Sequence, residues 1–251
     1  MPTWLLGVLV VLLSVLLAVA GLLLVRRLLP RTFLASHIEA TYTIHQAIAM
    51  VFGVSVGFAI LLSWEQLNTA EVTAQREASN LEAIYRLAQQ LPESDRNRVQ
   101  QLAQSYARAV IDEEWPLLAH GQASPHAQST ADELQGSIQK VEPNTMAEQA
   151  LYTQMLAKVV ELEENRELRL LESHEGVPPL LWSVLVIIGI ITVAFTYLFA
   201  IEPPWQHVLR VTALTVVVAL SLYTVRVIEY PFVGEVQVRP DAFEITPISS
   251  Q

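Results

Sequence analysis

The feature that most constrains this chain is a long helical segment that starts as a membrane span and continues as a soluble helix. Residues 47–63 are uncharged, and as a helix they are long enough to cross most of the hydrocarbon core of a bilayer. From Glu65 the sequence becomes polar, yet neither proline nor glycine occurs before Pro92. Because these residues are the strongest helix breakers, we expect one helix to run unbroken through the membrane edge.

The polar half of this helix carries an apolar seam. Its members follow one another at alternating spacings of three and four residues, with Glu77 as the one misfit: Leu67, Ala70, Ala74, Leu81, Ile84, Ala88 and Leu91. Such a seam is typical of a helix that packs against a partner helix.

The apolar residues gather in four stretches, which predict an all-α membrane protein with four transmembrane helices: 4–25, 44–64, 179–201 and 206–225. A helical extramembrane domain is inserted between the second and third spans. We expect a first hairpin at 1–64 and an acidic helical domain at 65–178. A second hairpin at 179–228 and a C-terminal tail at 229–251 follow.

Sidedness stays open. Two spans precede the inserted domain and two follow it, so the N-terminus, the domain and the tail share one side. Arginines directly after the first span favour an extracytoplasmic domain, because positive charge beside a span tends to stay in the cytoplasm. The number of arginines differs little between the two sides. The side opposite the domain has Arg26, Arg27, Arg31 and Arg210, and the side of the domain and tail has Arg226 and Arg239 beside the spans. Arg210, one turn inside the fourth span, either extends to the membrane surface or contacts anions.

The inserted domain is strongly acidic. Its 114 residues carry 19 Asp and Glu against 9 Lys and Arg, which accounts for the whole net charge of −10. Nucleic acid is therefore excluded as a partner, because phosphate binding needs clustered positive charge. A solvated helical surface is favoured over a cation-concentrating vestibule. Cysteine is absent, which excludes disulfides and thiolate chemistry.

Three further helices are expected inside this domain. Pro92 opens the first, over 93–119, which carries an apolar face. After a polar loop at 120–129, Thr130 and Glu133 form a capping box for a short helix to Lys140. Thr145 and Glu148 form another for a helix to about Ser173.

No catalytic or metal site is predicted. None of the six histidines pairs at the three- or four-residue spacing of a helical metal site, and no acid, base and nucleophile come together. The run Asp112-Glu113-Glu114 lacks a glycine-bent loop of oxygen ligands, so we interpret it as a solvated helix end. We therefore expect neither an enzyme nor a bound cofactor.

The second span contains Gly53 and Gly57, a pair that permits close helix packing. In an oligomer this packing could turn another face of the span towards a central axis, where a ring of mostly apolar side chains would form a narrow dewetting neck. The residues expected to line this pore are Phe52, Ser55, Val56, Ala59 and Ile60.

Three short motifs follow one another in order. They are Ala83-Ile84-Tyr85 leading to Leu91-Pro92, then Glu114-Trp115-Pro116, and finally a tail motif of Pro231, Phe232, Gly234, Glu235, Asp241 and Glu244. Together with the arrangement of spans, this order resembles bestrophins, whose fourth span precedes a Pro-Phe-Gly motif and acidic residues. The sequence is more similar to the bacterial bestrophin-like membrane family, over most of 44–244.

The resemblance implies a homo-oligomer in the bacterial inner membrane, pentameric in bestrophins, whose second spans line a pore for small anions. It also implies a cytosolic helical domain, in conflict with the arginine count, and a tail that braces neighbouring subunits. Val233 interrupts the Pro-Phe-Gly motif, and the acidic run that binds calcium in animal bestrophins is missing, so calcium gating is not implied. The competing hypothesis is a non-conducting membrane scaffold or sensor whose helical domain binds a protein.

Overall fold

The computed structural model describes residues 3–28, 38–174, 176–199 and 203–244, with the backbone alone for 38–40. All regular structure in these ranges is helical. The chain divides into two compact units. Unit 1 comprises residues 1–64 and 176–229, and unit 2 comprises 65–175 and 230–251. The tail, expected as a segment of its own, thus groups with the acidic helices.

Four helices are long and apolar enough to cross a membrane. They are α1 (Thr3–Leu28), α3 (Ile38–Ala88), α8 (Pro179–Thr196) and α9 (Pro204–Ile228). The third span ends five residues earlier than expected. Arg31, one of the arginines in the topology argument, lies outside the described residues. Trp205 is exposed in the first turn of α9.

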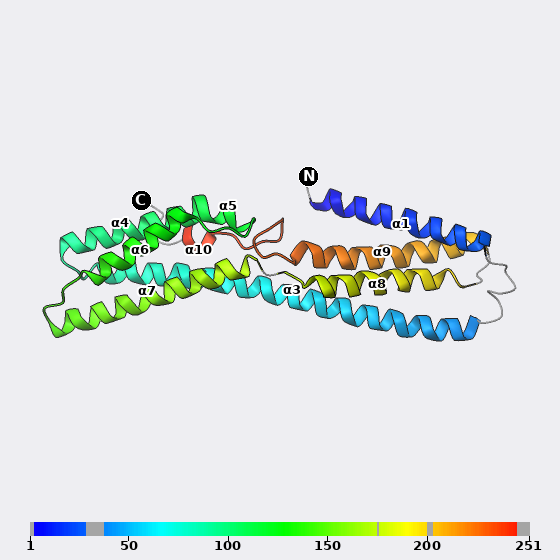
Figure 1. Ribbon diagram of the computed structural model, residues 1–251, viewed down its shortest axis with the longest axis horizontal. Coiled ribbons are helices and arrows are strands. Elements are labelled where there is room, and N and C mark those ends of the chain that lie inside the picture. Colours follow the sequence, from blue (N-terminus) through cyan, green and yellow to red (C-terminus); the bar gives the residue numbers. More distant parts are fainter. Residues whose placement is uncertain (1–2, 29–37, 175, 200–202, 245–251) are drawn as a thin grey trace. The chain divides into compact units, whose positions relative to one another are not determined.

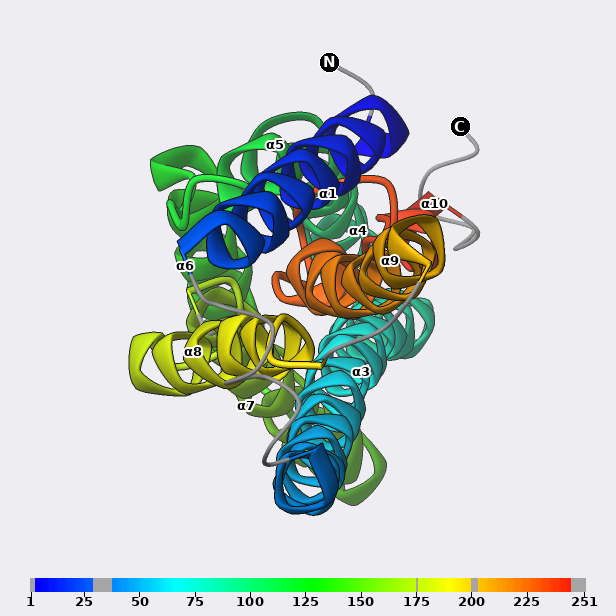
Figure 2. The same cartoon turned by 90° about the vertical axis from the view of Figure 1, so that its right-hand side faces the viewer.

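In unit 1, α9 lies alongside both α1 and α8 (Figures 1 and 2). The absence of side chains on two glycines lets α1 approach its neighbours closely. A Cβ on Gly7 would lie 2.7 Å from the ring of Tyr223 on α9, and one on Gly21 would lie 3.1 Å from Tyr197 after α8. The Tyr223 hydroxyl also donates a hydrogen bond to the carbonyl oxygen of Thr3.

Helix α3 is continuous over 51 residues and passes Trp64 and Glu65 without a break, as the sequence predicts. In its polar half the seam is buried: Ala70, Ala74, Leu81, Ile84 and Ala88 are at most 1% exposed. Leu81, Ile84 and Ala88 belong to the main apolar core of unit 2.

The other helices of unit 2 are α4 (Glu93–Ala109), a π-helical turn η1 (Val110–Glu114), α5 (Trp115–Leu118), α6 (Pro125–Gln139), α7 (Met146–Glu172) and α10 (Asp241–Glu244). Pro92 precedes α4 as predicted. The helix expected over 93–119 is interrupted by the π turn, which shifts the helical register just before Trp115.

Two predicted helix starts had different outcomes. Thr145 caps α7 as expected, accepting a hydrogen bond from the Glu148 N–H at 3.1 Å. The predicted start at Thr130 is wrong. Helix α6 begins at Pro125 with Ser124 as its N-cap, because a proline at the first helical position favours that start. Within α6, the Thr130 hydroxyl donates to the carbonyl oxygen of His126.

Candidate functional site: the exposed face of α3 and the tail anchor

One face of the membrane half of α3 is buried inside unit 1. Phe52, Val56 and Ala59 are 6%, 5% and 0% exposed and belong to its apolar core. A Cβ on Gly189 of α8 would lie 3.2 Å from the Phe52 ring, so these two helices are in close contact. Three of the five expected pore residues thus face their own subunit.

The other two expected pore residues, Ser55 and Ile60, are half-buried at the margins of this face. The Ser55 hydroxyl donates to the carbonyl oxygen of Val51 at 2.8 Å, so its hydrogen-bonding capacity is directed to its own helix. Neither residue belongs to the exposed strip on the opposite side of α3, which is formed by Met50, Val54, Phe58 and Leu61.

The opposite face of α3 is apolar and exposed. Met50, Val54, Phe58 and Leu61 are 73%, 51%, 62% and 58% exposed. At about 100° per residue they form one strip, roughly opposite the buried face. Sequence reasoning did not select this strip, because the span is apolar all round and polarity does not reveal which side the protein covers.

Gly53 and Gly57 lie at one edge of the exposed strip. A Cβ built on either residue would meet nothing within 4 Å in the described parts of the chain. Nothing among the described residues packs closely against these two glycines, so the helix-packing role expected for them stays a prediction that concerns a second chain.

The tail motif is anchored on Trp115, at the start of α5. The Phe232 ring meets the Trp115 ring edge-on at 5.7 Å, and the Phe243 ring of α10 does so at 5.9 Å. The indole N–H donates to the carbonyl oxygen of Val238 at 3.2 Å. Two motifs that lie more than 100 residues apart in the sequence, Glu-Trp-Pro and Pro-Phe-x-Gly, therefore meet in unit 2.

Two backbone features shape the tail. The N–H of Val238 donates to the carbonyl oxygen of Pro231 at 2.8 Å, which closes a loop. Within this loop Gly234 has a φ of 99°, a conformation that residues with a Cβ rarely adopt.

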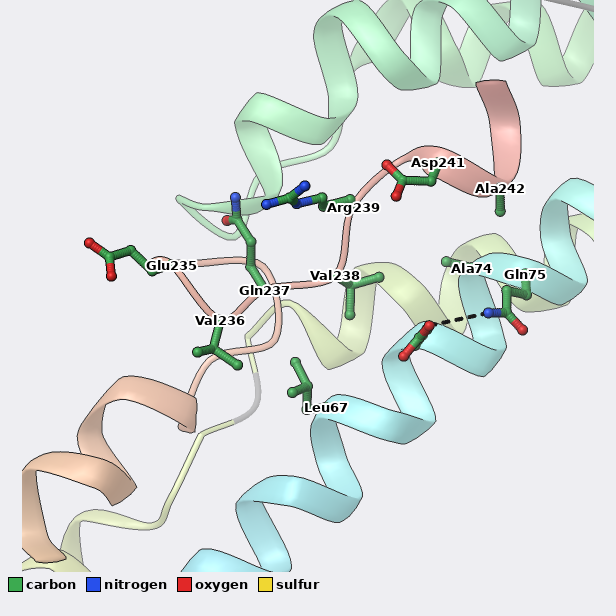
Figure 3. A pocket seen from close by; sticks show the side chains of 11 residues that line it. Leu67, Ala74, Gln75, Glu235, Val236, Gln237, Val238, Arg239, Asp241 and Ala242 are labelled. Atoms are coloured by element: carbon green, nitrogen blue, oxygen red, sulfur yellow. Dashed lines mark hydrogen bonds between the residues drawn. The ribbon is translucent and has the colours of Figure 1, made fainter. Parts of the chain in front are cut away.

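The acidic tail residues do not gather into a metal site. Glu235 and Asp241 line an open groove of about 400 Å³ between the tail and α3, with Glu71 and Arg239 among the other lining residues (Figure 3). Glu244 ends α10. In the described part of the chain, no group of three or more His, Asp or Glu side chains is placed to hold a metal ion.

Beneath Trp115 lies a buried ion cluster that consists of Glu77, Glu114, Arg166 and Arg169. Arg169 donates to Glu77 through Nε and Nη2 at 2.6 and 3.0 Å, and to Glu114 at 2.7 Å. Arg166 donates to Glu114 at 2.6 Å. All four residues are at most 5% exposed. The cluster thereby connects α3, η1 and α7.

Two aromatic residues complete this cluster. The Tyr106 hydroxyl donates to Glu77 at 2.6 Å. The guanidinium carbon of Arg169 lies 5.2 Å from the centre of the Trp115 ring, a cation–π contact. The same tryptophan therefore contacts the ion cluster as well as the tail.

The opposite charges in the cluster stabilise the ionised forms of Glu114 and Arg169. Burial alone would raise the pKa of Glu114, but the positive charges and hydrogen bonds of Arg169 and Arg166 outweigh it and lower that pKa. Burial would lower the pKa of Arg169, yet the charge and hydrogen bond of Glu77 raise it. Burial and then the Glu77 charge raise the pKa of Tyr106 well above its usual value. Glu114 is therefore ionised and Tyr106 is neutral at pH 7.

The prediction that the Asp112–Glu114 run is a solvated helix end is wrong for Glu114, which is fully buried. Asp112 and Glu113 are exposed, as expected. Glu113 accepts hydrogen bonds from His126 and from Ser124, and these bonds lower its pKa. The interruption of the apolar seam at Glu77 was the one sequence signal for this cluster.

The helical arrangement of the described residues is that of the bestrophin fold. Three similar crystal structures are of a bacterial bestrophin homologue from Klebsiella pneumoniae. One single-mutation variant has 11% identity and a TM-score of 0.73, covering 98% of this chain and 99% of that one. Another has 12% identity and a TM-score of 0.71, covering 94% of each chain. A structure phased with zinc has 12% identity and a TM-score of 0.69, covering 94% and 93%. At such low sequence identity, the structural similarity establishes the fold and no more.

The bestrophin-like domain family matches residues 12–243, which is nearly the whole chain. The protein therefore belongs to the bestrophin-like family. No curated protein matches the sequence.

Proposed function

We propose that this protein is a homo-oligomeric channel, pentameric like bestrophins, that conducts small anions passively across the bacterial inner membrane. All four candidate spans cross the bilayer, and the N-terminus, unit 2 and the tail share one side. Membership of a family known for channels rather than enzymes supports this class of function.

The observation that carries the proposal is the exposed apolar strip of α3. A helix in a bilayer can leave such a face to lipid, but here the strip is flanked by Gly53 and Gly57, which leave room for a neighbouring helix. We place Met50, Val54, Phe58 and Leu61 on the pore axis, because they lie opposite the face that the subunit covers. A ring of these side chains would form an apolar constriction that gates by dewetting.

The tail has a bracing role in this proposal. Trp115 fixes the tail to unit 2 through Phe232, Phe243 and the carbonyl oxygen of Val238. A tail held in this way presents a defined surface, including Glu235, Asp241 and Glu244, to an adjacent subunit.

A flux assay in liposomes tests the function. Purified protein is reconstituted into vesicles loaded with potassium chloride, and chloride efflux is compared with sodium and gluconate permeation. The proposal predicts a chloride leak that scales with the amount of protein, with slower gluconate and sodium permeation. Vesicles that stay sealed would contradict it and would favour a scaffold that binds a protein through unit 2.

A further inference from the structure

Unit 1 contains an apolar groove that the proposed pore does not use. It has a volume of about 420 Å³ and lies between α1, α8 and α9. Its lining is almost wholly apolar and includes small residues from each helix, such as Ser14, Ala194 and Ala219. All three helices are candidate membrane spans, so the surroundings of this groove are hydrocarbon rather than water.

At one end the groove reaches Tyr197, directly after α8. The carbonyl oxygen of the preceding residue, Thr196, lies 2.8 Å from Nε2 of the buried His207, and Nδ1 of His207 lies 2.8 Å from Nη2 of Arg26. A carbonyl only accepts and a guanidinium only donates, so His207 carries its proton on Nε2 and accepts from Arg26. The buried imidazole thus fixes the Arg26 side chain near the groove end.

Two more arginines belong to the same end of the helices. Arg27 lies next to Arg26 in the last turn of α1, and Arg210 lies one turn after His207 on α9. Both are exposed. Positive charge thus gathers where an apolar groove meets the membrane surface, and basic pockets between membrane helices suit phosphate headgroups.

We propose that this groove binds one acyl chain of an anionic phospholipid, whose phosphate is held at the end marked by Arg26, Arg27 and Arg210. The groove accommodates the chain, and the arginines select the headgroup charge. Apolar fit alone would not distinguish lipids that share the same acyl chains, so the selectivity comes from the arginines. This inference does not depend on whether the protein conducts ions.

The test measures lipid retention. Protein in detergent is incubated with dioleoylphosphatidylglycerol or dioleoylphosphatidylcholine, and the lipid bound per chain is measured by native mass spectrometry after gel filtration. The wild type should retain phosphatidylglycerol in preference to phosphatidylcholine. Equal retention of the two lipids would overturn the proposal.

Two sets of variants locate the site. Ala194→Leu and Ser14→Leu fill the groove and should both reduce phosphatidylglycerol retention, whereas Ala20→Leu, on the exposed side of α1, should not. Each of Arg27→Gln and Arg210→Gln should weaken phosphatidylglycerol binding about fivefold. Arg108→Gln in unit 2 is the matched control. Circular dichroism confirms that each variant is folded.

Wild-type retention in both groove-filling variants would overturn the assignment. A change of particle size in these variants with unchanged lipid retention would also overturn it, because the groove would then be a contact between subunits. Phosphatidylglycerol retention that is insensitive to both arginine replacements would exclude headgroup selection.

Discussion

Glu114 and Glu113 are adjacent glutamates with opposite environments. Glu114 is fully buried between two arginines, whereas Glu113 is exposed. Glu114→Gln leaves Arg166 and Arg169 short of a compensating charge in the interior of unit 2. We expect a loss of about 3–5 kcal/mol in the free energy of unfolding of this unit, because breaking a buried pair leaves an unpaired charge. Glu113→Gln should change the free energy of unfolding far less, because the Glu113 carboxylate is exposed to solvent. Urea unfolding in detergent, followed by tryptophan fluorescence, measures both, and equal losses would contradict this account.

Two glycines give a second contrast. Gly234 has a positive φ in the tail loop, whereas Gly136 is helical and a Cβ there would meet nothing within 4 Å. Gly234→Ala should destabilise the protein by about 1–2 kcal/mol. Gly136→Ala should stabilise it by about 0.5–1 kcal/mol, because alanine loses less backbone entropy in a helix. Thermal unfolding followed by circular dichroism should show shifts of opposite sign, and two shifts of the same sign would refute the assignment.

At the scale of helices, the two faces of α3 make a matched experiment possible. Val54 is exposed and Val56 is buried two residues later, so alanine removes the same atoms from each face. Val54→Ala should widen the constriction and raise chloride flux, because a smaller side chain leaves a wider apolar ring that stays wetted more readily. Val56→Ala should lower thermal stability without raising flux. Greater flux in Val56→Ala alone would instead support the lining first expected from the sequence.

Unit 2 should lose stability in acid. The folded pKa of Glu114 is lowered, so its ionised form contributes stability at pH values above the unfolded pKa of about 4.3. This contribution disappears as the pH falls through the lowered folded pKa, because the folded state must then take up a proton. Hydrogen exchange of α7 amides should therefore accelerate from pH 5 to pH 3 after correction for intrinsic rates. Glu114→Gln should flatten the pH dependence of hydrogen exchange in α7. The same pH dependence in this variant as in the wild type would contradict the prediction.

The buried face of α3 could be predicted from the sequence in the polar half of the helix but not in its membrane half. Leu81 and Ile84 stand among charged residues, so their spacing reveals the buried face. Around Phe52 and Val54 every side of the helix is apolar, and only the positions of α8 and α9 decide which side is covered. The buried Glu77 could be noticed as a misfit, but its partner Arg169 lies 92 residues away, a pairing that no local pattern specifies.

At the scale of the whole molecule, the chain combines a membrane unit, an acidic helical unit and one helix that belongs to both. The long helix and the four spans followed from composition and periodicity. The meeting of Trp115 with Phe232 and Phe243 did not, because it depends on how the tail returns to unit 2. The family match, over residues 12–243, extends over both units.

The most direct test of the central claim uses the absence of cysteine from the chain. Val54→Cys and Val56→Cys are reconstituted separately, and chloride flux is measured before and after a charged, water-soluble thiol reagent is added. We expect the reagent to block flux through Val54→Cys and to leave flux through Val56→Cys unchanged, because only the first side chain faces the proposed pore. Block of Val56→Cys with no effect on Val54→Cys would contradict the account.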